Sequence, residues 1–223
     1  MTSSSAQGSD GTVDRPPDKI SDYIRTAAQN YISRRANVPG AQNLVANGRS
    51  IIRPGATVRG DYGAPIYLGR YCRLDEGVVV APCVVPRSSD PLLSPSPSPS
   101  SSSSSSSSAA TAPPPGENEK ALPLSIGSHT SIGRGTVVMS VSVGSCVRIG
   151  SNCVLSPRTK IHDCCVVEDG TILPPDAVIP PFSRVRGNPG RIVGTLPECA
   201  GGEIAEGRVR DYLDFVEVLE GGD

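Results

Sequence analysis

The stretch VGSCVRIGSNCVLSPRTKIHDCCVVEDGTILPPDAVIPPFSRV, residues 143–185, carries an aliphatic residue at every sixth position. These positions are Val143, Ile149, Leu155, Ile161, Val167, Leu173, Ile179 and Val185. An α-helix would not keep them on one face over so many steps, and a simple strand would alternate with period two. The spacing predicts short flat strands joined by tight turns, three to a coil. Each strand places one aliphatic side chain in a triangular interior.

The same spacing recurs on the N-terminal side of this stretch. Its positions there are Ile52, Val58, Leu68, Leu74, Val80, Ile126, Ile132 and Val138, with a break after Val58 and a five-residue step after Val138. Four residues beyond nearly every aliphatic residue stands a small or β-branched one, and Cys72, Cys153 and Cys165 are among these. We therefore predict that these three thiols pack in the interior. A narrow interior of Val, Ile and Leu also agrees with an aromatic content of 4%.

Two polar segments lack the repeat. Residues 1–17 end in two prolines, and residues 87–121 contain a run of Ser-Pro steps followed by a serine tract. Such segments bury too little apolar surface to offset the entropy that ordering costs. We predict a disordered N-terminal tail and a long disordered serine- and proline-rich loop.

The repeat therefore divides the chain into coils on both sides of this loop. Residues 18–86 hold an N-terminal segment and the first coils, residues 122–200 hold the remaining coils, and residues 201–223 form a helix and a tail. Within the last part, the apolar residues recur at helical spacing, which predicts a helix along the flank of the coils. They are Val209, Tyr212, Leu213, Val216 and Leu219. The predicted fold class is all-β, a single parallel β-helix of roughly five to seven coils with a C-terminal α-helix.

Composition excludes several classes of function. Lys plus Arg is 21 and Asp plus Glu is 22, which argues against a nucleic-acid binder or a polybasic membrane-surface protein. No apolar stretch is long enough to span a bilayer, and the N-terminus lacks the pattern of a signal peptide. The seven cysteines form no CxxC pair, so we expect reduced thiols, a cytoplasmic protein and no zinc site.

Two histidines, His129 and His162, are the candidate neutral-pH bases. Hexapeptide-repeat proteins are commonly acyltransferases or metal-dependent hydratases, so an enzyme is the alternative to a binding protein. His129 comes three residues after Ile126, and His162 directly follows Ile161. We expect both on the outer wall or at a corner, as solvated surface side chains rather than catalytic ones.

The repeat resembles that of the left-handed parallel β-helix family, and the resemblance supplies the handedness. Residues 58–77, VRGDYGAPIYLGRYCRLDEG, further resemble the corresponding segment of gamma-class carbonic anhydrases. In that family three histidines bind the metal, and Ala81, Arg134 and Met139 stand at the matching positions here. Alanine offers no donor, arginine stays protonated, and the methionine sulfur suits soft metals.

The resemblance to this enzyme class therefore extends to the scaffold and not to the metal ligands. We expect no bound metal, no other cofactor and no catalytic residue. Arg59 and Asp61 of the Arg-Gly-Asp segment then either form a structural or interface ion pair or are surface residues without such a role.

More specific segments resemble the dynactin subunit 5 family. They are DYIRTA (22–27), YISRRA (31–36), GAQNLVANGRSIIRPGATVRGD (40–61), DCCVVEDGTILPPDAVIPPFSRVRGNPG (163–190) and LPEC (196–199). The resemblance covers about residues 20–86 and 122–219. The serine-rich insertion is longer than we expect of the family.

This resemblance implies a non-catalytic structural subunit of the dynactin pointed-end complex, in the cytoplasm and on the cytoskeleton. Such a subunit helps to cap the actin-like filament and to support the engagement of dynein adaptors and cargo. The implied partners are dynactin subunit 6, as a second β-helix, the pointed-end actin-related protein and dynactin subunit 4, with dynein and cargo adaptors contacted indirectly. No nucleic acid and no membrane insertion are implied. The alternative remains a hexapeptide-repeat enzyme, either carbonic anhydrase-like or a trimeric acyltransferase.

Overall fold

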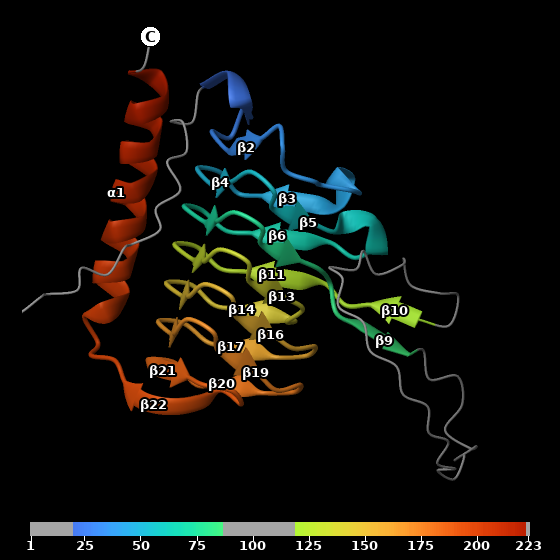
Figure 1. Ribbon diagram of the computed structural model, residues 1–223, viewed down its shortest axis with the longest axis vertical. Helices are drawn as coiled ribbons and strands as arrows, with labels where there is room; N and C mark the ends of the chain where they lie inside the picture. The colour runs from blue at the N-terminus through green and yellow to red at the C-terminus, as the bar shows by residue number, and fades with distance from the viewer. Residues whose placement is uncertain (1–19, 87–118, 222–223) are drawn as a thin grey trace, which may run out of the picture.

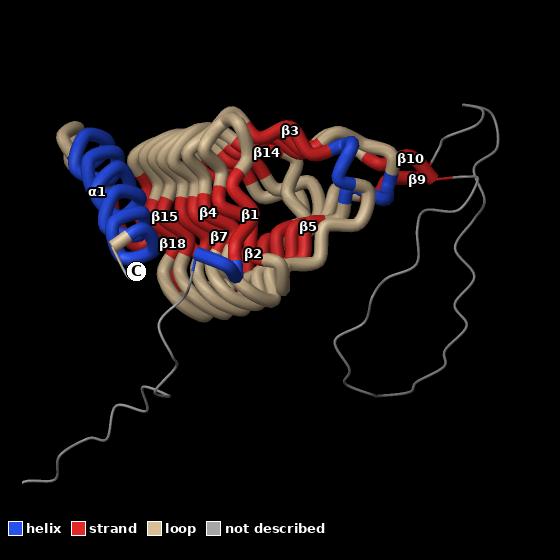
Figure 2. Tube along the Cα trace, turned by 90° about the horizontal axis from the view of Figure 1, so that it is seen from above, coloured by secondary structure: helices blue, strands red, loops and turns tan. Residues whose placement is uncertain are grey.

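The computed structural model describes residues 20–86 and 119–221. In these ranges short strands stack coil upon coil into the left-handed parallel β-helix that the repeat predicts (Figure 1). Three sheets form the faces of a triangular prism, which is seen end-on in Figure 2. The six-stranded sheet has one strand from each coil, in agreement with the predicted five to seven coils.

We call the three sheets A, B and C. Sheet A contains β1 (Tyr23–Arg25), β2 (Tyr31–Ser33), β4 (Ile51–Ile52), β7 (Arg73–Leu74), β12 (Ser131–Ile132), β15 (Arg148–Ile149), β18 (Val166–Val167), β21 (Ser183–Arg186) and β22 (Arg191–Thr195). Sheet B contains β5 (Thr57–Val58), β8 (Val79–Val80), β13 (Val137–Val138), β16 (Val154–Leu155) and β19 (Ile172–Leu173). Sheet C contains β3 (Leu44–Ala46), β6 (Ile66–Leu68), β11 (Leu124–Ile126), β14 (Ser142–Val143), β17 (Lys160–Ile161) and β20 (Val178–Ile179). Three single turns of 3₁₀-helix, η1 (Ile20–Asp22), η2 (Ala41–Asn43) and η3 (Gly60–Tyr62), complete the N-terminal coils.

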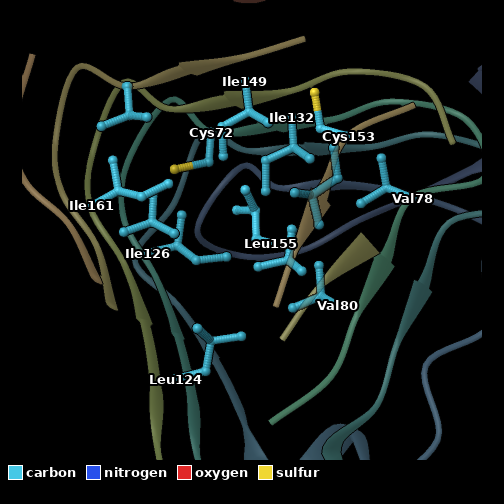
Figure 3. Packing of buried hydrophobic residues seen from close by; sticks show 14 of the residues in the cluster. Cys72, Val78, Val80, Leu124, Ile126, Ile132, Ile149, Cys153, Leu155 and Ile161 are labelled. Atoms are coloured by element: carbon cyan, nitrogen blue, oxygen red, sulfur yellow. The ribbon is translucent and has the colours of Figure 1, made fainter. Parts of the chain in front are cut away.

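The six-residue aliphatic series fills the interior, as predicted. Register is kept from coil to coil, so that Ile132 lies beside Ile149 and Ile149 beside Val167. Every member of the series is at most 5% exposed, and Figure 3 shows several of them converging on one core. The interior is therefore one continuous aliphatic stack.

The small-residue positions have a further role at the corners of the prism. The buried thiols of Cys72 and Cys153 donate hydrogen bonds to the backbone oxygens of Gly127, at 3.0 Å, and Glu168, at 3.1 Å. The hydroxyl of Thr136 donates to the oxygen of Gly150 at 2.8 Å. A buried carbonyl without a partner is costly, so a small side chain with a donor stabilises such a corner. The prediction that Cys72, Cys153 and Cys165 pack inside is confirmed.

Departures from the period of six occur at one corner, between sheets B and C. The step from Val58 to Leu68 holds η3, and the step from Val80 to Ile126 holds the serine-rich insertion. The five-residue step from Val138 to Val143 lies at the same corner. A loop that points outward at a corner leaves the strand pairing above and below intact, and extra length raises its closure entropy only slowly.

The predicted C-terminal boundary of the disordered loop, 87–121, is wrong. Residues Glu119–Ala121 form β10, which pairs antiparallel with β9 (Val84–Pro86) in a two-stranded arm. Pairing with a neighbouring strand uses backbone groups alone, so a polar composition did not indicate it. Residues 87–118 lie outside the described residues, as does the predicted tail 1–17, and both expectations stay predictions.

The C-terminal helix α1 (Ala200–Glu220) lies along sheet A, as Figures 1 and 2 show. Tyr212 and Leu219 are buried there, as the helical spacing predicts. Leu213 is 58% exposed, so its placement on the packed face was wrong. Successive helical residues are about 100° apart, so the residue next to Tyr212 points away from the sheet, and Phe215 packs there instead.

Candidate functional site

The three residues that the sequence resemblance matches to metal ligands of carbonic anhydrases do not converge. Ala81 and Met139 follow β8 and β13 and therefore stand on neighbouring coils, where the Ala81 N–H donates to the oxygen of Val138 at 2.9 Å. Arg134 follows β12 at another corner, and its guanidinium lies 3.1 Å from a carboxylate oxygen of Glu76. In the described ranges, no group of three or more His, Cys, Asp and Glu residues is arranged to hold a metal.

The two histidines lie on the outside of the prism, as expected. His129 sits at the corner between sheets C and A with a positive φ of 57°. Its ring stacks on that of Tyr71, with centroids 5.3 Å apart, and burial lowers the pKa of this imidazole. His162 is exposed at the start of a corner on a later coil. The structure gives His129 a packing role and does not bring the two imidazoles into contact.

Arg59 and Asp61 form an ion pair within the chain. The guanidinium lies 2.7 Å from one carboxylate oxygen and donates from Nε to the other at 3.2 Å. Its side chain is only 9% exposed and lies over the ring of Tyr62, 4.7 Å from the centroid. This pairing holds the pKa of Asp61 below its ordinary value. The geometry gives the pair a structural role at the corner between sheets B and C.

The backbone around this pair is tightly packed. A Cβ atom on Gly40, which has a φ of 69°, would lie 2.3 Å from the carbonyl carbon of Gly60. The amide of Asn43 donates to the oxygen of Gly60 at 2.8 Å. The two corner loops, η2 and η3, are therefore locked together, and Asp61 is the part of the pair that remains open to solvent.

A groove of about 720 Å³ lies between sheet A and the middle of α1, where Arg208 and Asp211 line it. It is lined mainly by charged side chains, most of which are matched. Arg73 donates to Asp75 at 2.8 Å, and Arg208 lies 2.8 Å from Asp211 on the same helix. Burial lowers the pKa of Arg208, but nearby carboxylates oppose that change. The groove is thus polar, and its charges largely offset one another.

The outer face of sheet B carries an aliphatic column that the sequence interpretation missed. The column consists of Val79, Val137, Val154 and Ile172, which lie in register on successive coils and are each partly exposed. Helix α1 covers sheet A and not this face (Figure 2). The signal was available, because each of these residues directly precedes an interior aliphatic residue. The inward period of six does not itself indicate which outward positions are apolar.

The outer face of sheet C is more polar. Its corresponding column runs Val45, Tyr67, Ser125, Ser142, Lys160 and Val178. The charged and hydroxyl side chains interrupt the apolar ones. Of the two faces that α1 leaves open, sheet B is the more continuous apolar surface.

Comparison with solved structures supports this architecture. A hexapeptide transferase family protein from Anaplasma phagocytophilum overlaps 85% of this chain, and 93% of its own chain is covered, with a TM-score of 0.55. The sequence identity is 12%, so this likeness concerns the fold alone. Fold and surface together define a hexapeptide-repeat parallel β-helix protein with an aliphatic outer face.

Comparison of the sequence is more specific. Residues 107–219, just over half of the chain, match the family model described as dynactin subunit 5. Dynactin subunit 5 of Dictyostelium discoideum is 35% identical over 125 residues, which cover 56% of this chain and 48% of that protein. The chain belongs to the dynactin subunit 5 family.

A second curated relative carries an enzymatic name. The putative acetyltransferase YvoF of Bacillus subtilis is 34% identical over 87 residues, covering 34% of this chain and 49% of that protein. The chain thus spans about half the length of both relatives. In the part of the chain that the structure describes, no helix is long and apolar enough to cross a membrane.

Proposed function

We propose that this chain is a non-catalytic architectural subunit of the dynactin pointed-end complex. There it helps to cap the actin-like filament and supports adaptor and cargo engagement by dynein. The observation that carries the proposal is family membership over the coils, combined with the outer face of sheet B. Its site of action is accordingly the cytoplasm and the cytoskeleton.

The proposed absence of catalysis rests on the residues at the inherited metal positions. Ala81 and Met139 offer no ligand suited to a hard or borderline cation, and Arg134 is already engaged by Glu76. His129 stacks on Tyr71 instead of facing a cleft lined by acidic groups. These contacts favour a scaffold over a hydratase.

The partner proposed for sheet B is the second β-helical subunit, dynactin subunit 6. The column of Val79, Val137, Val154 and Ile172 repeats at the spacing of neighbouring strands, about 4.8 Å. A second β-helix has the same repeat, so its side chains can interdigitate with this column without a change in backbone. A rigid sheet face also loses little conformational entropy on binding. The pointed-end actin-related protein and dynactin subunit 4 are proposed as further neighbours.

Affinity purification with matched variants tests this function. The tagged wild-type chain should recover the actin-related filament and dynactin subunit 6 from its own cells at moderate salt. Val154→Glu on sheet B should lose subunit 6, because a carboxylate would be buried in an apolar contact. Val178→Glu, on the 58% exposed position of sheet C, is the matched control and should retain it. Equal recovery by both variants would refute sheet B as the contact face.

A hexapeptide acyltransferase is the second candidate, favoured by the fold likeness and by the Bacillus relative. A stable homotrimer that purifies without any dynactin component would bring this alternative forward. Assays with acyl-CoA should then show turnover that is lost in His129→Ala or His162→Ala. We expect no turnover in the wild-type chain.

A further inference from the structure

Two thiols occupy the same place on neighbouring coils, at the corner between sheets C and A. Cys146 lies between β14 and β15, and Cys164 lies between β17 and β18. The flanking strands pair in register with an offset of eighteen residues, which is also the separation of the two cysteines. Both have a left-handed backbone, with φ of 55° and 56°. One side chain therefore stacks above the other.

The backbone and side-chain contacts agree with this stacking. The N–H of Cys164 donates to the oxygen of Ser145, the residue before Cys146, at 2.9 Å. Burial and the neighbouring Cys164 thiol raise the pKa of Cys146, and burial raises the pKa of Cys164. Neighbouring strands are about 4.8 Å apart, and the Cα atoms of disulfide-bonded cysteines are about 4.4–6.8 Å apart. The corner can therefore accept a disulfide with little movement.

The environment separates this pair from the other cysteines. Cys72, Cys83, Cys153 and Cys165 are buried, whereas Cys146 and Cys164 are partly exposed and Cys199 is exposed. The first turn of α1 lies over the pair, since a Cβ atom on Gly201 would be 2.8 Å from the sulfur of Cys164. All are free thiols in this structure. The corner is thus a paired dithiol with limited access.

We propose that Cys146 and Cys164 are a site of reversible oxidation, closing a disulfide between two coils when a peroxide is the oxidant. Hydrogen peroxide oxidises one thiol to a sulfenic acid and leaves as water. The second sulfur attacks the sulfenic sulfur, the S–S bond forms, and the hydroxyl leaves with the second thiol proton as another water. Two thiols lose two electrons and two protons in total, and one peroxide becomes two waters. A dithiol reductant reverses the closure.

Peptide mapping of the full chain tests this site. After peroxide treatment and alkylation, trypsin releases Cys146 in residues 135–148, Cys153 in residues 149–158, Cys164 in residues 161–184 and Cys199 in residues 192–208. We expect one linked species that joins 135–148 to 161–184 and disappears on reduction. Cys164→Ser should abolish it, and Cys165→Ala should leave it, which separates the two adjacent cysteines.

Stability provides a readout that does not depend on mapping. Closure should raise the urea midpoint of the oxidised wild-type chain, because the bond constrains the unfolded state. Cys146→Ser should show no such rise while folding normally when reduced. Alkylation of both Cys146 and Cys164 under conditions that oxidise Cys199 would overturn the proposal, as would a linked species between Cys164 and Cys199.

Discussion

The interior of the coils and the seam beneath α1 are both apolar, but they are built from different residues. The interior is aliphatic, with Ile, Leu and Val closed off by small residues at the corners. The seam is largely aromatic, and Tyr23, Tyr31, Tyr71, Tyr212 and Phe215 gather there. The difference follows from the room available for side chains. Each coil has room for one interior side chain per face, whereas the gap between a helix and a sheet is wide enough for aromatic rings.

The tyrosines of the seam also hold the helix through hydrogen bonds from their hydroxyl groups. The hydroxyl of Tyr212 donates to the backbone oxygen of Gln29 at 2.9 Å, and that of Tyr31 donates to the carboxylate of Glu220 at 3.1 Å. Tyr23 and Phe215 meet edge to face, with centroids 5.2 Å apart. The helix is therefore attached at its C-terminal half, whereas its middle borders the charged groove. A substitution that disrupts the seam should therefore undock α1 and leave the coils folded.

The largest effect is expected from a charge in the interior. Ile161→Asp should destabilise the chain by roughly 3–5 kcal/mol, because the change removes a buried aliphatic side chain and buries a carboxyl group without a partner. Urea unfolding followed by circular dichroism measures this loss. Lys160→Asp, on the outward side of the same strand, is the control and should cost far less. Similar losses for both would place Ile161 outside the core.

A smaller effect is expected from removing a ring in the seam. Tyr212→Ala should cost roughly 3 kcal/mol of helix docking, through lost packing and the lost bond to Gln29. Limited proteolysis should then cleave α1 while the coils remain resistant. Leu213→Ala, at the neighbouring exposed position, should leave the cleavage pattern unchanged. If the coils became sensitive together with α1, the two regions would be one cooperative unit.

The two regions were not equally predictable. The interior repeats, so one pattern determined the positions of Ile149, Leu155 and all their equivalents, and the same pattern implied a flat-sided prism. The seam does not repeat, so helical spacing alone predicts Leu213 where Phe215 packs. The accessibility of the outward column of sheet B depends on which face α1 covers. The arm of β9 and β10 depends on backbone pairing. Neither property is expressed in the inward period of six.

Alkaline pH should weaken the seam through Tyr31. Burial and the hydrogen bond to Glu220 raise the pKa of Tyr31 to about 12, above its ordinary value of 10.0. The unfolded chain therefore ionises first, so the stabilisation is fully present below pH 10 and is lost between about pH 10 and 12. Tyr31→Phe should reduce this alkaline loss of helix docking, measured by proteolysis across that range. An unchanged alkaline profile in the variant would contradict this assignment.

The smallest effects distinguish two ion pairs at the corner between sheets B and C. Arg59 and Asp61 form a pair whose arginine is almost covered, whereas Arg158 and Asp176 are both largely exposed. Asp61→Asn should cost about 1 kcal/mol, and Asp176→Asn should change the melting temperature little because solvent screens the pair.

The acid dependence separates the two pairs further. The pKa of Asp61 is held below its ordinary value by Arg59, so its contribution is present above about pH 4 and is lost as the pH falls further. Thermal melts between pH 7 and pH 3 should therefore show a gap between wild type and Asp61→Asn that narrows toward the acidic end. A gap that did not narrow would mean that Asp61 acts through packing and not through its charge. The two variants can also be compared at pH 7. If Asp176→Asn lowered the melting temperature as much as Asp61→Asn, burial of the arginine would add nothing to the stability of the Arg59–Asp61 pair.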